Sequence, residues 1–120
     1  MKASPRSKKL QPRFRILCGK EIAMGPGKAE LLEQLQKTGS IADAAQNLGM
    51  SYMRAWKLIK TMEECFKEPL VLATRGGSKG GGAGLSAAGE KVLRLYRELE
   101  AKSLKASAKT WAQMVKFLAD

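Results

Sequence analysis

Basic and aromatic side chains gather in the ten residues that begin at Ser51. If this segment forms a helix, its arginine and lysine side chains can donate hydrogen bonds to guanine O6 and N7 in the major groove of a duplex. The residues near the helix start come closest to the base edges. This pattern therefore predicts recognition of double-stranded DNA. The residues expected to contact DNA are Ser51, Tyr52, Met53, Arg54, Trp56, Lys57 and Lys60.

The same predicted helix needs a face that packs on its own domain. Four apolar residues recur at intervals of four, three and four positions, which places them on one side: Ala55, Ile59, Met62 and Phe66. The basic residues then point away from the domain. An ordinary solvated surface is the alternative interpretation of this basic face. Trp56 borders both faces, and it either anchors the core, as tryptophan usually does in a small domain, or contacts DNA.

The residues before this helix have the capping chemistry of a tight turn between two short helices. Ser40 is placed to cap the first helix, and Gly49 supplies the left-handed backbone that ends it. Ala44 and Ala45 give that helix a small apolar face, so that the two helices can cross closely. Ser51 begins the second helix. The order predicts a helix-turn-helix.

A glycine-rich segment follows, in which six of the ten residues that begin at Arg75 are glycine. A strand is predicted just before it, over Leu70–Thr74, and Leu85 can close a returning strand. We expect a wing whose Arg75 and Lys79 lie along the DNA backbone or in the minor groove, with a merely flexible loop as the alternative. Lys79 is not followed by serine or threonine, so the nucleotide-binding Walker pattern is absent.

The other segments complete the domain organisation. Residues 1–12 are expected to form a disordered basic arm, which either solubilises the chain or contacts phosphates. Residues 13–85 are expected to form the winged helix-turn-helix DNA-binding domain, with a strand or hairpin over 14–24 and a first helix from Pro26 to Thr38. Residues 86–120 are expected to form the C-terminal, dimerising part, with one long helix from Ser86 to about Leu118. The predicted fold class is mainly α with a small β wing, a winged helix-turn-helix with a long C-terminal dimerisation helix.

Two apolar runs on the predicted C-terminal helix favour self-association. The first contains Val92, Tyr96 and Leu99, and the second contains Leu104, Ala108, Trp111, Val115 and Leu118. Such spacing is typical of a coiled-coil seam. The alternative is that the helix folds back on its own domain. We expect a homodimer, because a two-fold dimer places two recognition helices about 34 Å apart on one side of a duplex.

Charge and composition narrow the function further. The 120 residues carry 22 Lys and Arg against 11 Asp and Glu, a net charge of +11 that favours a polyanionic partner, nucleic acid before an anionic membrane. The chain has no histidine, and its two cysteines, Cys18 and Cys65, lack a CxxC spacing. We therefore expect no catalytic residues, no metal and no cofactor. No apolar run is long enough to span a bilayer, and a cytoplasmic protein with reduced thiols is expected.

Five motifs together resemble one family over residues 14–100. They are Gly25-Pro26-Gly27-Lys28, Gly39-Ser40-Ile41, the segment from Met50 to Trp56, the glycines of 76–82, and Leu85-Ser86-Ala87-Ala88-Gly89. The sequence resembles the N-terminal DNA-binding domain of ModE-type molybdate-responsive transcriptional regulators. A winged helix-turn-helix is shared with the LysR family and others.

The resemblance implies that 51–60 lies on the recognition helix, 75–84 is the wing and the helix from Ser86 contributes to a dimer interface. Full-length ModE proteins carry molybdate-binding domains after this part, and we expect no molybdate site in these 120 residues. The hypothesis is a sequence-specific, homodimeric transcriptional regulator. The alternative is a non-sequence-specific architectural or RNA-associated basic protein, and a third is an enzyme that uses the glycine segment on a phosphorylated ligand.

Overall fold

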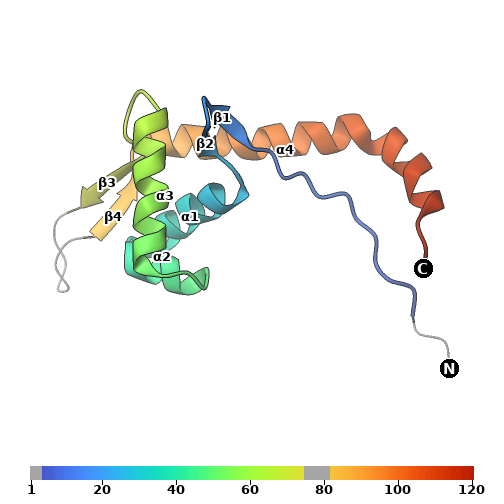
Figure 1. Ribbon diagram of the computed structural model, residues 1–120, viewed down its shortest axis with the longest axis horizontal. Helices are drawn as coiled ribbons and strands as arrows, with labels where there is room; N and C mark the ends of the chain where they lie inside the picture. Colours follow the sequence, from blue (N-terminus) through green and yellow to red (C-terminus); the bar gives the residue numbers. More distant parts are fainter. Residues whose placement is uncertain (1–3, 75–81) are drawn as a thin grey trace.

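The computed structural model describes residues 4–74 and 82–120, and Figure 1 shows their arrangement. The elements in chain order are β1 (Ile16–Cys18), β2 (Glu21–Met24), α1 (Pro26–Thr38), α2 (Ile41–Asn47), α3 (Tyr52–Cys65), β3 (Val71–Thr74), β4 (Gly82–Leu85), α4 (Ala87–Met114) and a final 3₁₀ turn (Val115–Phe117). This is the predicted winged helix-turn-helix with a long C-terminal helix.

The hairpin β1–β2 forms where alternating apolar residues predict it. Gly19 has a φ of 63°, which lets the chain reverse tightly, and Cys18 pairs with Glu21 across the turn. The inner end of β2 enters the core, because Ala23 and Met24 are buried. β1 is exposed along its length. The hairpin therefore packs through β2, which contacts α3.

Helices α1, α2 and α3 surround a common apolar core. Helix α1 begins with proline at its first position and ends at Gly39, whose φ is 70°. Its buried face consists of Lys28, Ala29, Leu31, Leu32 and Leu35. Residues from the other elements complete the core, and the largest fully buried side chains are Met24, Leu31, Leu32, Leu35, Met62, Leu70 and Tyr96.

Strands β3 and β4 form the predicted antiparallel ladder, with Val71 opposite Leu85 and Ala73 opposite Ala83. The amide of Ala83 also donates to the carbonyl of Gly39 at 2.9 Å, which fixes β4 to the end of α1. The predicted wing residues Arg75 and Lys79 lie outside the described residues. The ladder places the base of the wing beside the start of α2.

Helix α4 lies across the domain, and its second half projects beyond it (Figure 1). Its buried residues are Gly89, Leu93 and Tyr96, whereas Leu99 is 42% exposed. The α-helix ends at Met114, earlier than the predicted Leu118, because a 3₁₀ turn over Val115–Phe117 replaces the last α-helical turn. Because Leu93 is buried and Leu99 is exposed, the predicted apolar run through Val92, Tyr96 and Leu99 coincides only partly with the face that packs on the domain.

Residues 4–15 contain no helix or strand and run beside the outer half of α4. The Nε of Arg6 donates to the main-chain oxygen of Asp120 at 3.0 Å, and the Lys8 ammonium lies 3.7 Å from the Asp120 carboxylate. Leu10 lines a groove together with Trp111 and Met114 of α4. The disorder predicted for residues 1–12 remains a prediction.

Candidate nucleic-acid interface

The turn between α2 and α3 holds α3 close to its support. Gly49 has a φ of 67°, and its amide donates to the carbonyl of Gln46 at 3.1 Å. The amide of Met50 donates to the carbonyl of Ala45 at 3.0 Å, which closes the turn. Ala45 and the facing Ala55 of α3 are both buried, so no long side chain separates the helices. The predicted helix-turn-helix is confirmed.

Both helices of this unit have a serine cap. The Oγ of Ser40 accepts from the amide of Asp43, and the Oγ of Ser51 accepts from the amide of Arg54, each at 3.1 Å. A cap satisfies one amide that the first turn of a helix leaves unpaired, so it fixes where the helix begins. Ser51 therefore sets the start of α3, and with it the position of the first-turn side chains.

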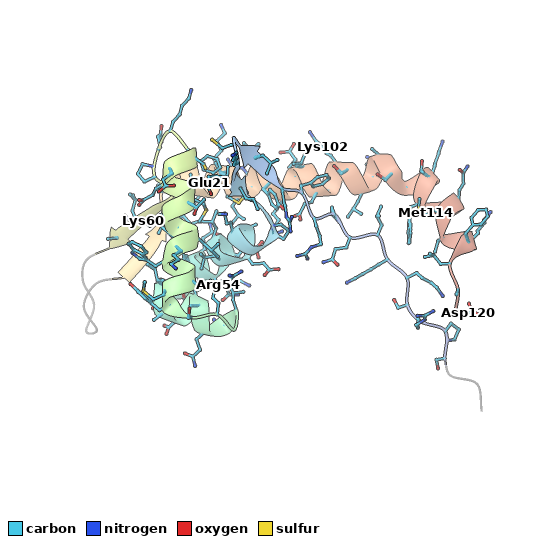
Figure 2. The ribbon with its side chains drawn as sticks, viewed as in Figure 1. Glu21, Arg54, Lys60, Lys102, Met114 and Asp120 are labelled. Carbon is cyan, nitrogen blue, oxygen red and sulfur yellow. The ribbon has the colours of Figure 1, made fainter. Side chains whose placement is uncertain are left out.

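The exposed face of α3 carries the side chains that the spacing predicts. Ala55, Ile59 and Met62 are buried, and the expected contact residues all lie on the exposed side. Tyr52 and Met53 are 51% and 58% exposed at the first turn. Arg54 and Lys57 are exposed beside them (Figure 2 labels Arg54 and Lys60 on α3). The fold brings together seven of the nine predicted site residues, and the other two are the undescribed Arg75 and Lys79.

Trp56 is not part of the core, because it is 40% exposed. The ammonium of Lys60 lies 5.1 Å from the centroid of its indole ring, within the range of a cation–π interaction. The same ammonium lies 3.3 Å from the Oε2 of Glu63. Lys60 therefore has two partners on its own helix, and the Glu63 carboxylate competes with a phosphate for its ammonium.

A shallow recess joins the start of α3 to the base of the wing. It is lined by Ser40, Ile41, Ala42, Tyr52, Gly82 and Ala83. Sequence reasoning places Tyr52 on the interface but misses Ala42 and Ala83, because the backbone hydrogen bond from Ala83 to Gly39 is what ties β4 to the chain just before α2. A backbone pairing of this kind leaves no residue-type signal in the sequence.

A separate polar cluster lies near the other end of α3 and is not part of this interface. Lys28 is only 8% exposed, and burial lowers its pKa, while Cys65 and Glu21 act in the opposite direction. Burial raises the pKa of Cys65, and the Cys18 thiol contributes to the same rise.

Within the described ranges, no three His, Cys, Asp or Glu side chains are grouped closely enough to hold a metal ion. No helix in that part of the chain has the length and apolarity needed to cross a bilayer.

Comparison with known proteins finds relatives that match 59–65% of this chain. The chain is 42% identical over 78 residues to the molybdenum-pterin-binding protein MopB of Rhodobacter capsulatus, which covers 65% of this chain and 29% of MopB. It is 40% identical over 78 residues to the molybdenum transport protein ModE of Azotobacter vinelandii, with the same coverage. It is 37% identical over 71 residues to the DNA-binding transcriptional dual regulator ModE of Escherichia coli, covering 59% of this chain and 27% of that protein.

These relatives confirm the resemblance to ModE-type regulators, although the chain spans less than a third of their length. They also support a DNA-binding regulator rather than an enzyme. The model of the bacterial regulatory helix-turn-helix proteins of the lysR family matches residues 27–90, from the first turn of α1 to the first turn of α4. The chain therefore belongs to the lysR family of bacterial regulatory helix-turn-helix proteins.

Proposed function

We propose that the protein is a homodimeric transcriptional regulator that binds double-stranded DNA sequence-specifically through α3. The observation that carries the proposal is the exposed basic face of α3, with Arg54 in the first turn and Lys57 in the second turn after a serine-capped start. Arginine and lysine at the beginning of a helix can reach guanine edges in the major groove. Ala45 of α2 and Ala55 of α3 are buried, so the two helices pack closely and the opposite, basic face of α3 stays exposed.

The wing supplies the second contact in this proposal. Gly82 and Ala83, at the outer end of the β3–β4 ladder, line the recess together with Tyr52. The connection between the two strands therefore joins β4 next to the start of α3. Arg75 and Lys79 belong to that connection, and we assign them to phosphates or the minor groove. Phosphate contacts add affinity that falls with salt and carry no direct base information, whereas minor-groove contacts distinguish mainly A·T from G·C pairs.

The dimer in this proposal forms through an exposed apolar surface on α4 and the hairpin. A groove of about 310 Å³ is lined by Ile16, Phe66, Val92, Leu95, Tyr96 and Leu99. Leu95 is 51% exposed and Leu17, on the neighbouring strand, is 65% exposed. Exposed apolar side chains grouped in this way favour a protein partner over solvent. A second copy is the occupant that also provides a second α3 for a two-fold DNA site.

Selection of bound duplexes from a random pool tests the DNA part of the proposal. We expect a palindromic site to be recovered. Arg54→Ala and Lys57→Ala should each weaken binding to that site by about 1–3 kcal/mol and weaken random-duplex binding much less. Lys67→Ala, which removes an exposed charge after α3, is the matched control. Equal losses on both duplexes favour the non-sequence-specific architectural protein instead.

Sedimentation equilibrium tests the dimer separately. Leu95→Gln with Leu99→Gln should convert the dimer to monomer and weaken palindrome binding, while the circular dichroism spectrum stays helical. The control is Leu72→Gln, an equally polar change at a leucine that is 47% exposed on β3. A wild-type monomer at every concentration tested contradicts the homodimer.

The names of the Rhodobacter capsulatus and Azotobacter vinelandii relatives refer to molybdenum, and we propose that the matched part of this chain contributes DNA binding without a molybdate site. Titration calorimetry with sodium molybdate should therefore show no saturable heat. Saturable binding would overturn this assignment and leave the role of α3 intact.

A further inference from the structure

A row of cations follows the solvent side of α4. We call its members, all exposed, the α4 basic row: Lys91, Arg94, Lys102, Lys105 and Lys109. Their spacing is three, eight, three and four positions, and Glu98 occupies the place midway in the gap of eight. Residues three and four apart share a side of an α-helix, so the row is continuous. It spans about 27 Å, at 1.5 Å per residue.

The row faces away from the domain. Lys91 lies two positions after the buried Gly89, and Glu98 lies two positions after the buried Tyr96. Two positions correspond to about 200° around an α-helix, so both side chains are on the side opposite the buried face. Figure 2 shows Lys102 on the side of α4 opposite the N-terminal segment, and Arg54 on the distant part of α3. Helix α1 packs against both α3 and α4. The C-terminal end of α3, at Cys65, lines a cavity together with Ala88 and Val92 of α4, whereas Arg54 lies near the other end of α3. A duplex held by the first turns of α3 therefore lies toward the end of α3 that is distant from α4.

The fold leaves the charge of the row almost uncompensated. Glu98 is its single acid, and its carboxylate lies 2.8 Å from the Lys102 ammonium. That contact lowers the pKa of Glu98 and raises the pKa of Lys102. Lys91, Arg94, Lys105 and Lys109 have no ion pair within residues 4–74 and 82–120. No acid occurs between Glu100 and Asp120, so the charge extends to the outer end of the helix.

The chemistry of the row suits a regularly charged polyanion. Within the pair Lys91 and Arg94, and within the group Lys102, Lys105 and Lys109, the cations lie about 4.5–6 Å apart along the helix axis. A gap of about 12 Å, with Glu98 at its middle, separates the two groups. DNA presents phosphates at intervals comparable to the shorter spacing along each strand. Four of the five cations are lysines, which act as point charges and do not select a base pattern. An apolar stripe beside the row, as an amphipathic membrane helix requires, is interrupted after Leu99 by Lys102 and Ser103.

We propose that the α4 basic row is a second, sequence-independent binding site for double-stranded DNA, which lets one protein join two duplex segments. The proposal rests on the function assigned to α3, since the row adds a second duplex to the one that α3 binds. The binding is electrostatic, so its affinity should fall steeply as salt rises.

A two-duplex capture experiment tests the row. The protein is saturated with its immobilised palindromic duplex, and an unrelated, fluorescent duplex is added across a salt series. Wild-type protein should retain the fluorescent duplex. Lys105→Gln with Lys109→Gln should capture it about tenfold less and make the log–log salt slope less steep by about 1.8, while palindrome affinity stays unchanged. Lys20→Gln with Lys67→Gln removes the same charge elsewhere and should capture it like wild type.

The possible results separate the row from the function of α3. Palindrome binding without capture overturns the row and leaves the proposed function standing. An equal loss of capture in both double variants also overturns it, because net charge alone then explains the effect. A matching loss of palindrome affinity in the row variant shows that the row contacts the first duplex, and binding of phosphatidylserine vesicles without capture of DNA assigns the row to membranes. Row-dependent duplex binding without a selectable palindrome supports the row and overturns the function proposed for α3.

Discussion

The phenol of Tyr96 donates a hydrogen bond of 2.7 Å to the main-chain carbonyl of Phe14. Tyr96 is 2% exposed, so this bond lies in the core and joins the middle of α4 to the residues that lead into β1. The next residue, Arg97, pairs with Glu33 of α1 and with Glu100. Together these contacts fix the direction of α4 relative to the domain. In a dimer built on α4, they also determine the separation of the two α3 helices.

Tyr96→Phe should lower the free energy of unfolding by about 1–2 kcal/mol, because it removes the donor and leaves the Phe14 carbonyl without that partner. Urea unfolding followed by circular dichroism measures the change. Tyr52→Phe is the matched control, since the Tyr52 side chain is half exposed and makes no hydrogen bond within the described residues. Equal effects of the two substitutions would contradict a specific role for the Tyr96 hydroxyl.

The same hydroxyl should give stability a dependence on alkaline pH. Burial, with Glu100 nearby, raises the pKa of Tyr96 above its ordinary value of 10.0. The pKa of Tyr96 is higher in the folded protein than in the unfolded one. The contribution of its neutral hydroxyl to the free energy of unfolding is therefore fully present below pH 10 and is lost as pH rises through the folded pKa. Lys28, whose pKa is lowered, makes stability rise with pH in the alkaline range, but wild type and Tyr96→Phe share this residue, so its effect cancels in their comparison. The stability difference between wild type and Tyr96→Phe should therefore shrink above pH 10.

Gly89 is required where α4 meets β3. A β-carbon at this position would overlap the carbonyl oxygen of Leu70 and lie 3.0 Å from its carbonyl carbon. The Leu70 oxygen cannot retreat easily, because it accepts from the Ser86 amide at 2.9 Å. Gly89→Ala should lower the free energy of unfolding by about 3 kcal/mol or more, or prevent folding. Thermal unfolding measures the effect.

Gly27→Ala is the control for that substitution. A β-carbon at Gly27, also in the first turn of a helix, meets no described atom within 4 Å. Alanine has the higher helix propensity, so this variant should be as stable as wild type or gain up to about 1 kcal/mol. A Gly89→Ala protein with wild-type stability would show that α4 can shift away from β3.

Sequence reasoning succeeds here where the determinant is local. Ser40, Gly49 and Ser51 each act within three or four residues of the chain, so residue type and spacing are enough to place α2, the turn and α3. The buried face of α3 is equally local, because its period is that of one helix. The exposed position of Arg54 and Lys57 follows from that period.

The parts that sequence reasoning misses depend on contacts between distant segments. The apolar pattern of α4 contains several faces of similar hydrophobicity, and the close approach of Gly89 to Leu70 decides in favour of the face that contains Leu93. The hydrogen bond from Tyr96 to Phe14 spans 82 positions. Trp56 has the residue type of a core anchor, but its place beside Lys60 on the outer face of α3 is set by the packing of Ala55 and Ile59.

Glu63→Gln should strengthen DNA binding by about twofold to fivefold at low salt, the free energy of one exposed ion pair. The carboxylate of Glu63 occupies the Lys60 ammonium, and its removal leaves that ammonium available to a phosphate. The gain should appear on palindromic and random duplexes alike and vanish as salt rises. Fluorescence anisotropy at several salt concentrations measures it.

Glu64→Gln is the control for the ion pair, because it removes the same charge from the adjacent residue, which makes no ion pair in the described part of the chain. If both variants gain equally, general repulsion between α3 carboxylates and DNA accounts for the effect. A gain restricted to Glu63→Gln identifies Lys60 as the phosphate contact.

Substitutions at Ser51 separate the cap of α3 from its proximity to DNA. Ser51→Ala should lower the free energy of unfolding by about 1 kcal/mol, because the Arg54 amide loses its acceptor. Ser51→Asp and Ser51→Asn restore an acceptor and should unfold like wild type. Thermal unfolding compares the three proteins with wild type.

Duplex binding by the same proteins should follow charge rather than stability. Ser51→Asp places a carboxylate at the start of α3, where the proposed interface approaches phosphates, so its affinity should fall about tenfold or more at low salt and recover partly at higher salt. Ser51→Asn has no added charge and should bind close to wild type. If Ser51→Asp binds DNA normally, the first turn of α3 lies away from the phosphates, and the orientation proposed for the recognition helix is wrong.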